Sequence, residues 1–145
     1  MSKWHKVDEA KAAGDKLPNM LPGTFKVRID RIKDFEGFQG DLFYIIEFEV
    51  LESSNEDIEV GKFYSQVIKY NQTMGPINVK RFVMAASGLD PNDSENEEAI
   101  GAEEVEESLS DEQPFSGLVM DLQCDNITTQ KNKPFTKYTW EAVED

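Results

Sequence analysis

Alternation of apolar and polar side chains with a period of two is the feature that most constrains the fold of this chain. Three successive segments show it, and they are residues 24–35, 41–52 and 62–70. In the first segment Phe25, Val27 and Ile29 alternate with charged residues, and the phase shifts at Arg31 and Ile32. Because neighbouring side chains of a strand point to opposite faces, the pattern predicts half-buried strands. The phase shift predicts a bend or β-bulge.

The second and third segments divide into two faces in the same way. In the second, one face carries Leu42, Tyr44, Ile46, Phe48 and Val50, and the other carries Phe43, Ile45, Glu47 and Glu49. In the third, Phe63 and Val67 lie opposite Tyr64, Gln66, Ile68 and Tyr70. Between the first two segments, FEGFQGD supplies two glycines for a hairpin. Three consecutive strands are therefore expected.

The pattern becomes helical after these strands. Met74, Gly75 and Pro76 are typical of a helix start, and Gly88 predicts its end. A second helix is expected around Val105 and Leu109. Strand character returns in PFSGLVMDLQCDNI and, after the turn TTQKNK, in PFTKYTWEAV.

The resulting order is three strands, a helical region and two strands. A five-stranded Greek-key barrel of the OB-fold class has its helix at this place, between strands 3 and 4. A β-sandwich or an SH3-like barrel also accommodates five strands, and the helix position favours the OB-fold. A chain of 145 residues fits one domain. We expect an N-terminal arm over residues 1–22 and the barrel domain over residues 23–145.

The acidic charge of the chain is concentrated in one region. The formal net charge is −14, yet residues 1–81 carry 12 basic and 13 acidic side chains. Residues 82–130 carry 13 acidic side chains and no Lys or Arg, and 11 of these acids lie in residues 90–113. Such a composition is typical of a solvated or disordered segment. The sequence therefore predicts a nearly neutral barrel with a mobile acidic insert at 90–113.

Patterns for catalysis, metal binding or membrane insertion are lacking in the sequence. His5 and Cys124 are the only His and Cys, and they lie 119 positions apart, which does not suggest a zinc site or a Cys-His pair. The stretch from Asp90 resembles a calcium loop but has Glu95 and Gly101 at its two most demanding positions. We predict no enzyme activity, no metal and no cofactor. Short apolar runs and a lone cysteine predict a cytoplasmic protein without membrane contact.

Basic and aromatic residues interleave along the predicted barrel strands. Single-stranded nucleic acid is bound by cations that contact phosphates and by flat rings on which bases stack. We expect Phe25, Phe48, Phe82 and Trp140 to pack in the core. The candidate nucleic-acid-binding residues are Lys26, Arg28, Arg31, Lys33, Lys62, Tyr64, Lys69, Tyr70, Lys131, Lys133, Lys137 and Tyr138.

Several stretches together resemble a family of small tailed-phage proteins with an OB-fold that bind single-stranded DNA. They are LPGTFKVRIDRIKDFEGFQGDLFYIIEFEVLES, NVKRFVMAASGL and KNKPFTKYTWEAV. The resemblance implies sequence-independent coating of single-stranded DNA in phage replication and recombination, inside an infected bacterial host. It also implies partner replication or recombination proteins, contacted through acidic residues. This chain departs from the family in having its acids inside the sequence, with only EAVED at its end.

The acidic region also supports a function of a different class. A segment with 13 acids and no Lys or Arg favours protein partners of opposite charge. The alternative is therefore an acidic interaction module, or a DNA mimic, that engages a basic protein. The sequence leaves the oligomeric state open.

Overall fold

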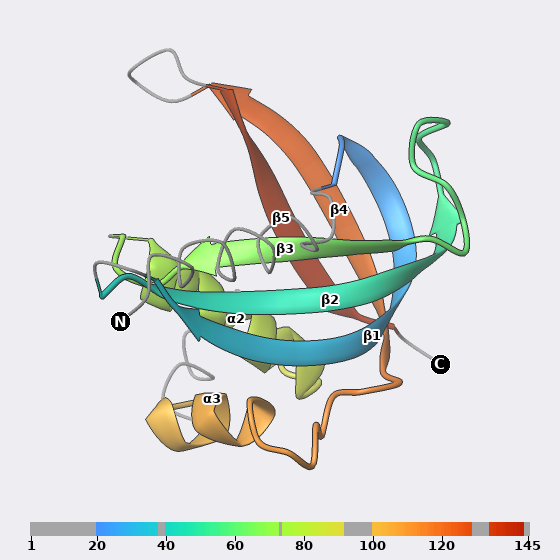
Figure 1. The fold of residues 1–145 in the computed structure, drawn as a ribbon. Coiled ribbons are helices and arrows are strands. Elements are labelled where there is room, and N and C mark those ends of the chain that lie inside the picture. Colours follow the sequence, from blue (N-terminus) through green and yellow to red (C-terminus); the bar gives the residue numbers. More distant parts are fainter. Residues whose placement is uncertain (1–19, 38–39, 73, 92–99, 129–133, 144–145) are drawn as a thin grey trace, which may run out of the picture.

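A single antiparallel sheet of five strands forms the body of the protein in the computed structural model (Figure 1). The structure describes residues 20–37, 40–72, 74–91, 100–128 and 134–143. Its strands are β1 (Gly23–Glu36), β2 (Leu42–Ser53), β3 (Phe63–Lys69), β4 (Val119–Thr128) and β5 (Pro134–Ala142), in the spatial order β3-β2-β1-β4-β5. Helices α2 (Gly75–Ala86) and α3 (Ala102–Ser108) lie between β3 and β4 in the chain. The predicted mainly β class and the predicted order of these elements are confirmed.

Strand β1 is long and bent, and it connects the two halves of the sheet because it pairs with β2 on one side and with β4 on the other (Figure 1). It pairs with β2 from Phe25 to Glu36, but with β4 only from Gly23 to Arg28. Register shifts interrupt the β1–β2 pairing between Lys26 and Val27 and between Ile29 and Arg31. The predicted bulge is therefore present, and it lies where β1 parts from β4.

Segments outside the sheet satisfy the backbone of β1 beyond that point. The Ile29 N–H donates to the Leu118 carbonyl at 2.8 Å, and the Ile29 carbonyl accepts from Gly117 N–H at 2.7 Å. The side chain of Gln113 then binds Ile32 twice: its Oε1 accepts from the Ile32 N–H at 2.7 Å, and its Nε2 donates to the Ile32 carbonyl at 2.8 Å. The strand predicted from residue 114 therefore begins only at Val119.

Side-chain hydrogen bonds connect the two edge strands of the curved sheet, β3 and β5. Trp140 Nε1 on β5 donates to Gln66 Oε1 on β3 at 2.7 Å, and the Tyr138 hydroxyl donates to the Ser65 carbonyl at 3.5 Å. Helix α2 packs against β5 and β3. The core between them contains the four aromatic residues predicted there, Phe25, Phe48, Phe82 and Trp140. Trp140 makes edge-to-face contacts with Phe48 and Phe82, at ring-centroid distances of 5.3 and 5.0 Å.

Residues 100–113 pack against the sheet, whereas the sequence predicted a mobile insert over residues 90–113. Ile100 is buried, and buried Ser108 on α3 shares a 2.7 Å hydrogen bond with the Tyr44 hydroxyl. Gln113 is bound to β1 as described above. The acidic composition of the segment gave no indication of these few anchoring side chains. Residues 92–99 of the same segment, and most of the predicted N-terminal arm, lie outside the described residues.

Candidate nucleic-acid interface

Most of the predicted cations lie on the face of β1, β2 and β3 that points away from the core. We call this surface the outer face. It consists of cross-strand rows that run from β1 across β2 to β3, and Lys26 of β1 also belongs to it. The rows are Phe35–Phe43–Lys69, Lys33–Ile45–Val67 and Arg31–Glu47–Ser65. A fourth row follows after the bulge, in which Arg28 pairs with Glu49 and Glu49 with Phe63.

Aromatic rings lie at both ends of the outer face. Phe35 is 41% exposed and lies beside half-buried Phe43, with 6.2 Å between their ring centroids. Phe63 is 42% exposed and belongs to the row of Glu49. These three phenylalanines were not among the predicted site residues. The alternation separated Phe43 and Phe63 from Tyr44 and Tyr64 on the opposite faces of their strands, but it did not say which face of β3 points outward.

Four of the predicted cations are held in ion pairs by carboxylates of the neighbouring segments. Lys33 Nζ lies 3.2 Å from Glu47 Oε2, and Arg28 Nη1 lies 3.4 Å from Glu49 Oε1. The other two pairs are Lys26–Glu52 at 3.4 Å and Lys69–Asp41 at 3.5 Å. The outer face therefore has a balanced charge rather than the basic surface that the cations alone suggested.

Two other predicted cations, Arg31 and Lys62, are exposed and have no ion pair within the described part of the chain. Arg31 is the cross-strand neighbour of Glu47 on the outer face. Lys62 directly precedes Phe63 at the start of β3. Both positions leave a cation next to the aromatic and apolar residues of this face.

The three predicted stacking tyrosines occupy different environments. Tyr70 is exposed at the end of β3. Tyr64 is only 8% exposed, and its hydroxyl accepts from the Glu59 N–H at 3.1 Å, so the prediction of an exposed ring was wrong. Tyr138 is half-buried, its hydroxyl accepts from the Met20 N–H at 3.0 Å, and burial raises its pKa to about 12. Both rings face inward because that side of β3 and β5 closes over the core.

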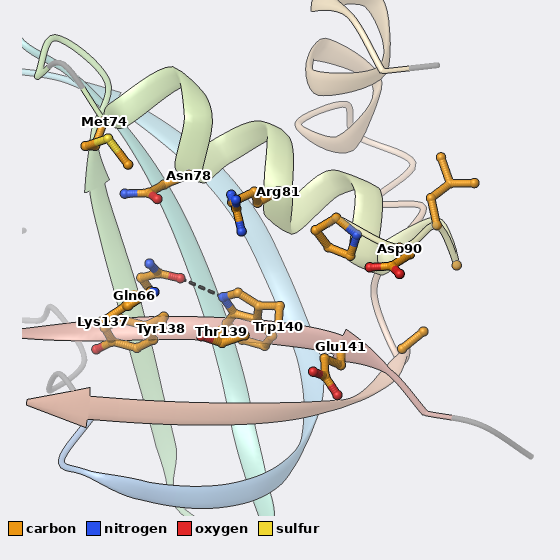
Figure 2. Close-up of a pocket in the computed structure, with 14 residues that line it drawn as sticks. Gln66, Met74, Asn78, Arg81, Asp90, Lys137, Tyr138, Thr139, Trp140 and Glu141 are labelled. Carbon is orange, nitrogen blue, oxygen red and sulfur yellow. Dashed lines mark hydrogen bonds between the residues drawn. The ribbon is translucent and has the colours of Figure 1, made fainter. Parts of the chain in front are cut away.

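Lys137, the remaining predicted residue on β5, borders a cleft of about 640 Å³ between α2 and β5. Figure 2 shows Asn78 and Arg81 reaching from α2 toward Lys137, Tyr138 and Trp140, with Asp90 and Glu141 toward the other end. Two cations and two carboxylates line this cleft, so its charges also balance. The predicted residues Lys131 and Lys133 lie outside the described residues.

Cys124, the only cysteine of the chain, is buried on β4. Burial and the neighbouring Asp125 carboxylate raise the pKa of the Cys124 thiol to about 12, so the thiol stays protonated at neutral pH. No three His, Cys, Asp or Glu side chains among the described residues gather in a way that could hold a metal ion. In the same part of the chain, no helix has both the length and the apolar character needed to cross a membrane.

Searches against models of protein families and against curated proteins gave no match to this chain. The resemblance to phage single-stranded DNA-binding proteins therefore stays a prediction.

Proposed function

We propose that this protein binds single-stranded DNA, without sequence preference, on the outer face of β1, β2 and β3. The observation that carries the proposal is the arrangement of exposed rings and cations in adjacent rows of one surface. Phe35 and Phe43 lie next to the row of Lys33, and Phe63 lies in the row of Arg28. Every base has a flat face that stacks on such rings, and base–aromatic stacking contributes about 1–3 kcal/mol per base.

The strand order supports assignment to the OB-fold class. In the sheet, β1 lies between β2 and β4, and the helical region precedes β4, as expected for a five-stranded Greek-key barrel. OB-folds bind oligonucleotides on the face of strands 2 and 3 and on the adjacent loops. Half-buried Phe43 of β2 and exposed Phe63 of β3 occupy that face here. By resemblance, we propose a role in phage DNA replication or recombination inside the infected cell, with other replication proteins as partners.

A titration of fluorescently labelled oligonucleotides tests this function. The full chain is mixed with single-stranded DNA of mixed sequence, and separately with the matching duplex, at 20 mM and 200 mM salt. We expect tighter binding of the single strand than of the duplex, because only unpaired bases can stack on the rings. Binding should also weaken as salt rises. Absence of binding to single strands at 20 mM salt would reject the proposal.

The acidic helix α3 supports a second candidate function, in which the protein engages a basic partner protein. Its exposed glutamates Glu103, Glu106 and Glu107 are held in a fixed place, because Ser108 is bonded to Tyr44 in the core. Changing these three to Gln should weaken binding to a lysine-rich model peptide and leave the fold intact. Equal peptide binding by the variant and the original chain would reject this function.

A further inference from the structure

The aromatic residues of the outer face form two groups that are separated by charged residues. Phe35 and Phe43 lie at one end, and Phe63 lies at the row of Glu49. From Phe43 to Glu49 there are six residue steps along β2, which corresponds to about 20 Å in a strand. Glu47 and Glu49 lie on this path. The shortest path for a DNA strand that stacks bases on both groups passes over these two carboxylates.

The two carboxylates hold the cations that such phosphates need. Glu47 binds Lys33 at 3.2 Å and has Arg31 as its cross-strand neighbour, while Glu49 binds Arg28 at 3.4 Å. The Glu47 side chain is only 14% exposed, so its charge is the less hydrated of the two. Lys33 and Arg28 therefore each have a carboxylate partner in the absence of DNA.

We infer that Glu47 and Glu49 act as built-in competitors of the DNA phosphates, so that binding exchanges a carboxylate for a phosphate at Lys33 and at Arg28. This inference rests on the proposed function. The exchange lowers the affinity, because each released carboxylate lies close to the incoming phosphate and repels it. It also lowers the dependence on salt. A phosphate that binds a cation releases about 0.7 counterion from a single strand, but the freed carboxylate attracts a cation in its place.

Neutral substitutions of the two glutamates test the inference. The variants Glu47→Gln, Glu49→Gln and the double variant keep the side-chain length and remove the charge. We expect each single variant to bind single-stranded DNA about five- to tenfold more tightly at 20 mM salt, since two unit charges about 4 Å apart interact by about 1 kcal/mol even in water. The slope of log affinity against log salt should steepen by about 0.7 for each cation freed.

A matched control is Glu141→Gln, which removes one exposed negative charge from β5, two strands from β1 and outside the rows of Glu47 and Glu49. It should change affinity less than twofold and leave the salt slope unchanged. Circular dichroism and thermal melting of each variant establish that it is folded. Glu49 is the more exposed of the two glutamates, so Glu49→Gln provides the test if Glu47→Gln fails to fold.

The outcomes separate this inference from the proposed function. Tighter binding and a steeper slope in Glu47→Gln or Glu49→Gln, but not in Glu141→Gln, support it. If the unmodified chain binds single strands and the variants bind with equal or lower affinity and an unchanged slope, the inference is wrong while the proposed function stands. If neither the unmodified chain nor the double variant binds, both are wrong.

Discussion

The side chain of Gln113 takes the place of a missing strand, and its removal should destabilise the fold strongly. In Gln113→Ala the N–H and the carbonyl of buried Ile32 lose partners at 2.7 and 2.8 Å. A buried polar group that is left unpaired costs about 1–3 kcal/mol. Gln113 is half-buried, so water reaches part of the site, and we expect a total loss of about 2–4 kcal/mol.

Urea unfolding followed by circular dichroism measures this loss. The midpoint should fall while the slope of the free energy against urea stays constant, because the substitution does not change the surface exposed on unfolding. The melting temperature should fall by about 6–15 °C for a chain of this length. Gln113→Glu retains an acceptor for the Ile32 N–H but has no donor for its carbonyl, so it should also be destabilised.

The control for this prediction is Gln123→Ala. Gln123 is exposed on β4, and its side-chain amide donates to the Asp125 carboxylate at 3.1 and 3.3 Å. Its removal should change stability by less than about 0.5 kcal/mol. If Gln113→Ala were as stable as Gln123→Ala, the conclusion that Gln113 replaces a strand partner of β1 would be refuted.

Three further predictions concern stability. Gly75→Ala should unfold the start of α2 and lower the melting temperature by more than 5 °C, because an added Cβ would clash with the carbonyl oxygens of Lys69 and Tyr70; an unchanged melting temperature would contradict this close approach. Tyr44→Phe should cost about 1 kcal/mol in urea unfolding through loss of the hydroxyl bond to Ser108, and a neutral effect would show that this bond does not anchor α3. Burial raises the pKa values of Cys124 and Tyr138 to about 12, so the folded state retains protons that the unfolded state loses first. These two groups should therefore make stability fall between about pH 9 and 12, with a shallower fall in Tyr138→Phe above pH 10; a flat profile from pH 9 to pH 12 would contradict this burial.

Alternation along the chain was sufficient to predict the five strands and the bulge of β1, because burial of one face imposes the period of two. It could not determine which side of β3 faces inward. Both sides carry an aromatic residue at the start of the strand, Phe63 and Tyr64, and the choice depends on how β5 closes over the sheet. The ion pairs were equally hidden, since the pairing of Arg28 with Glu49 depends on the register shifts in β1.

The acidic segment shows a second limit of composition as a guide. Its many carboxylates predict a solvated segment, yet Ile100, Ser108 and Gln113 anchor its second part to the sheet. A single side chain that hydrogen-bonds the sheet, such as Gln113, can fix the position of a segment whose average composition is polar. No local pattern marks Gln113, because its role arises only where β4 has left β1.

Binding of single-stranded DNA by a double variant of the outer face tests the central claim most directly. Phe43→Ala with Phe63→Ala removes one ring from each aromatic group, and Ile127→Ala removes an exposed apolar side chain from β4 as the control. At about 1 kcal/mol or more per stacked base, affinity at 20 mM salt should fall roughly 30-fold or more in the double variant, and by less than twofold in the control. Equal affinity of the folded double variant and the unmodified chain would contradict the assignment of the outer face as the DNA-binding surface.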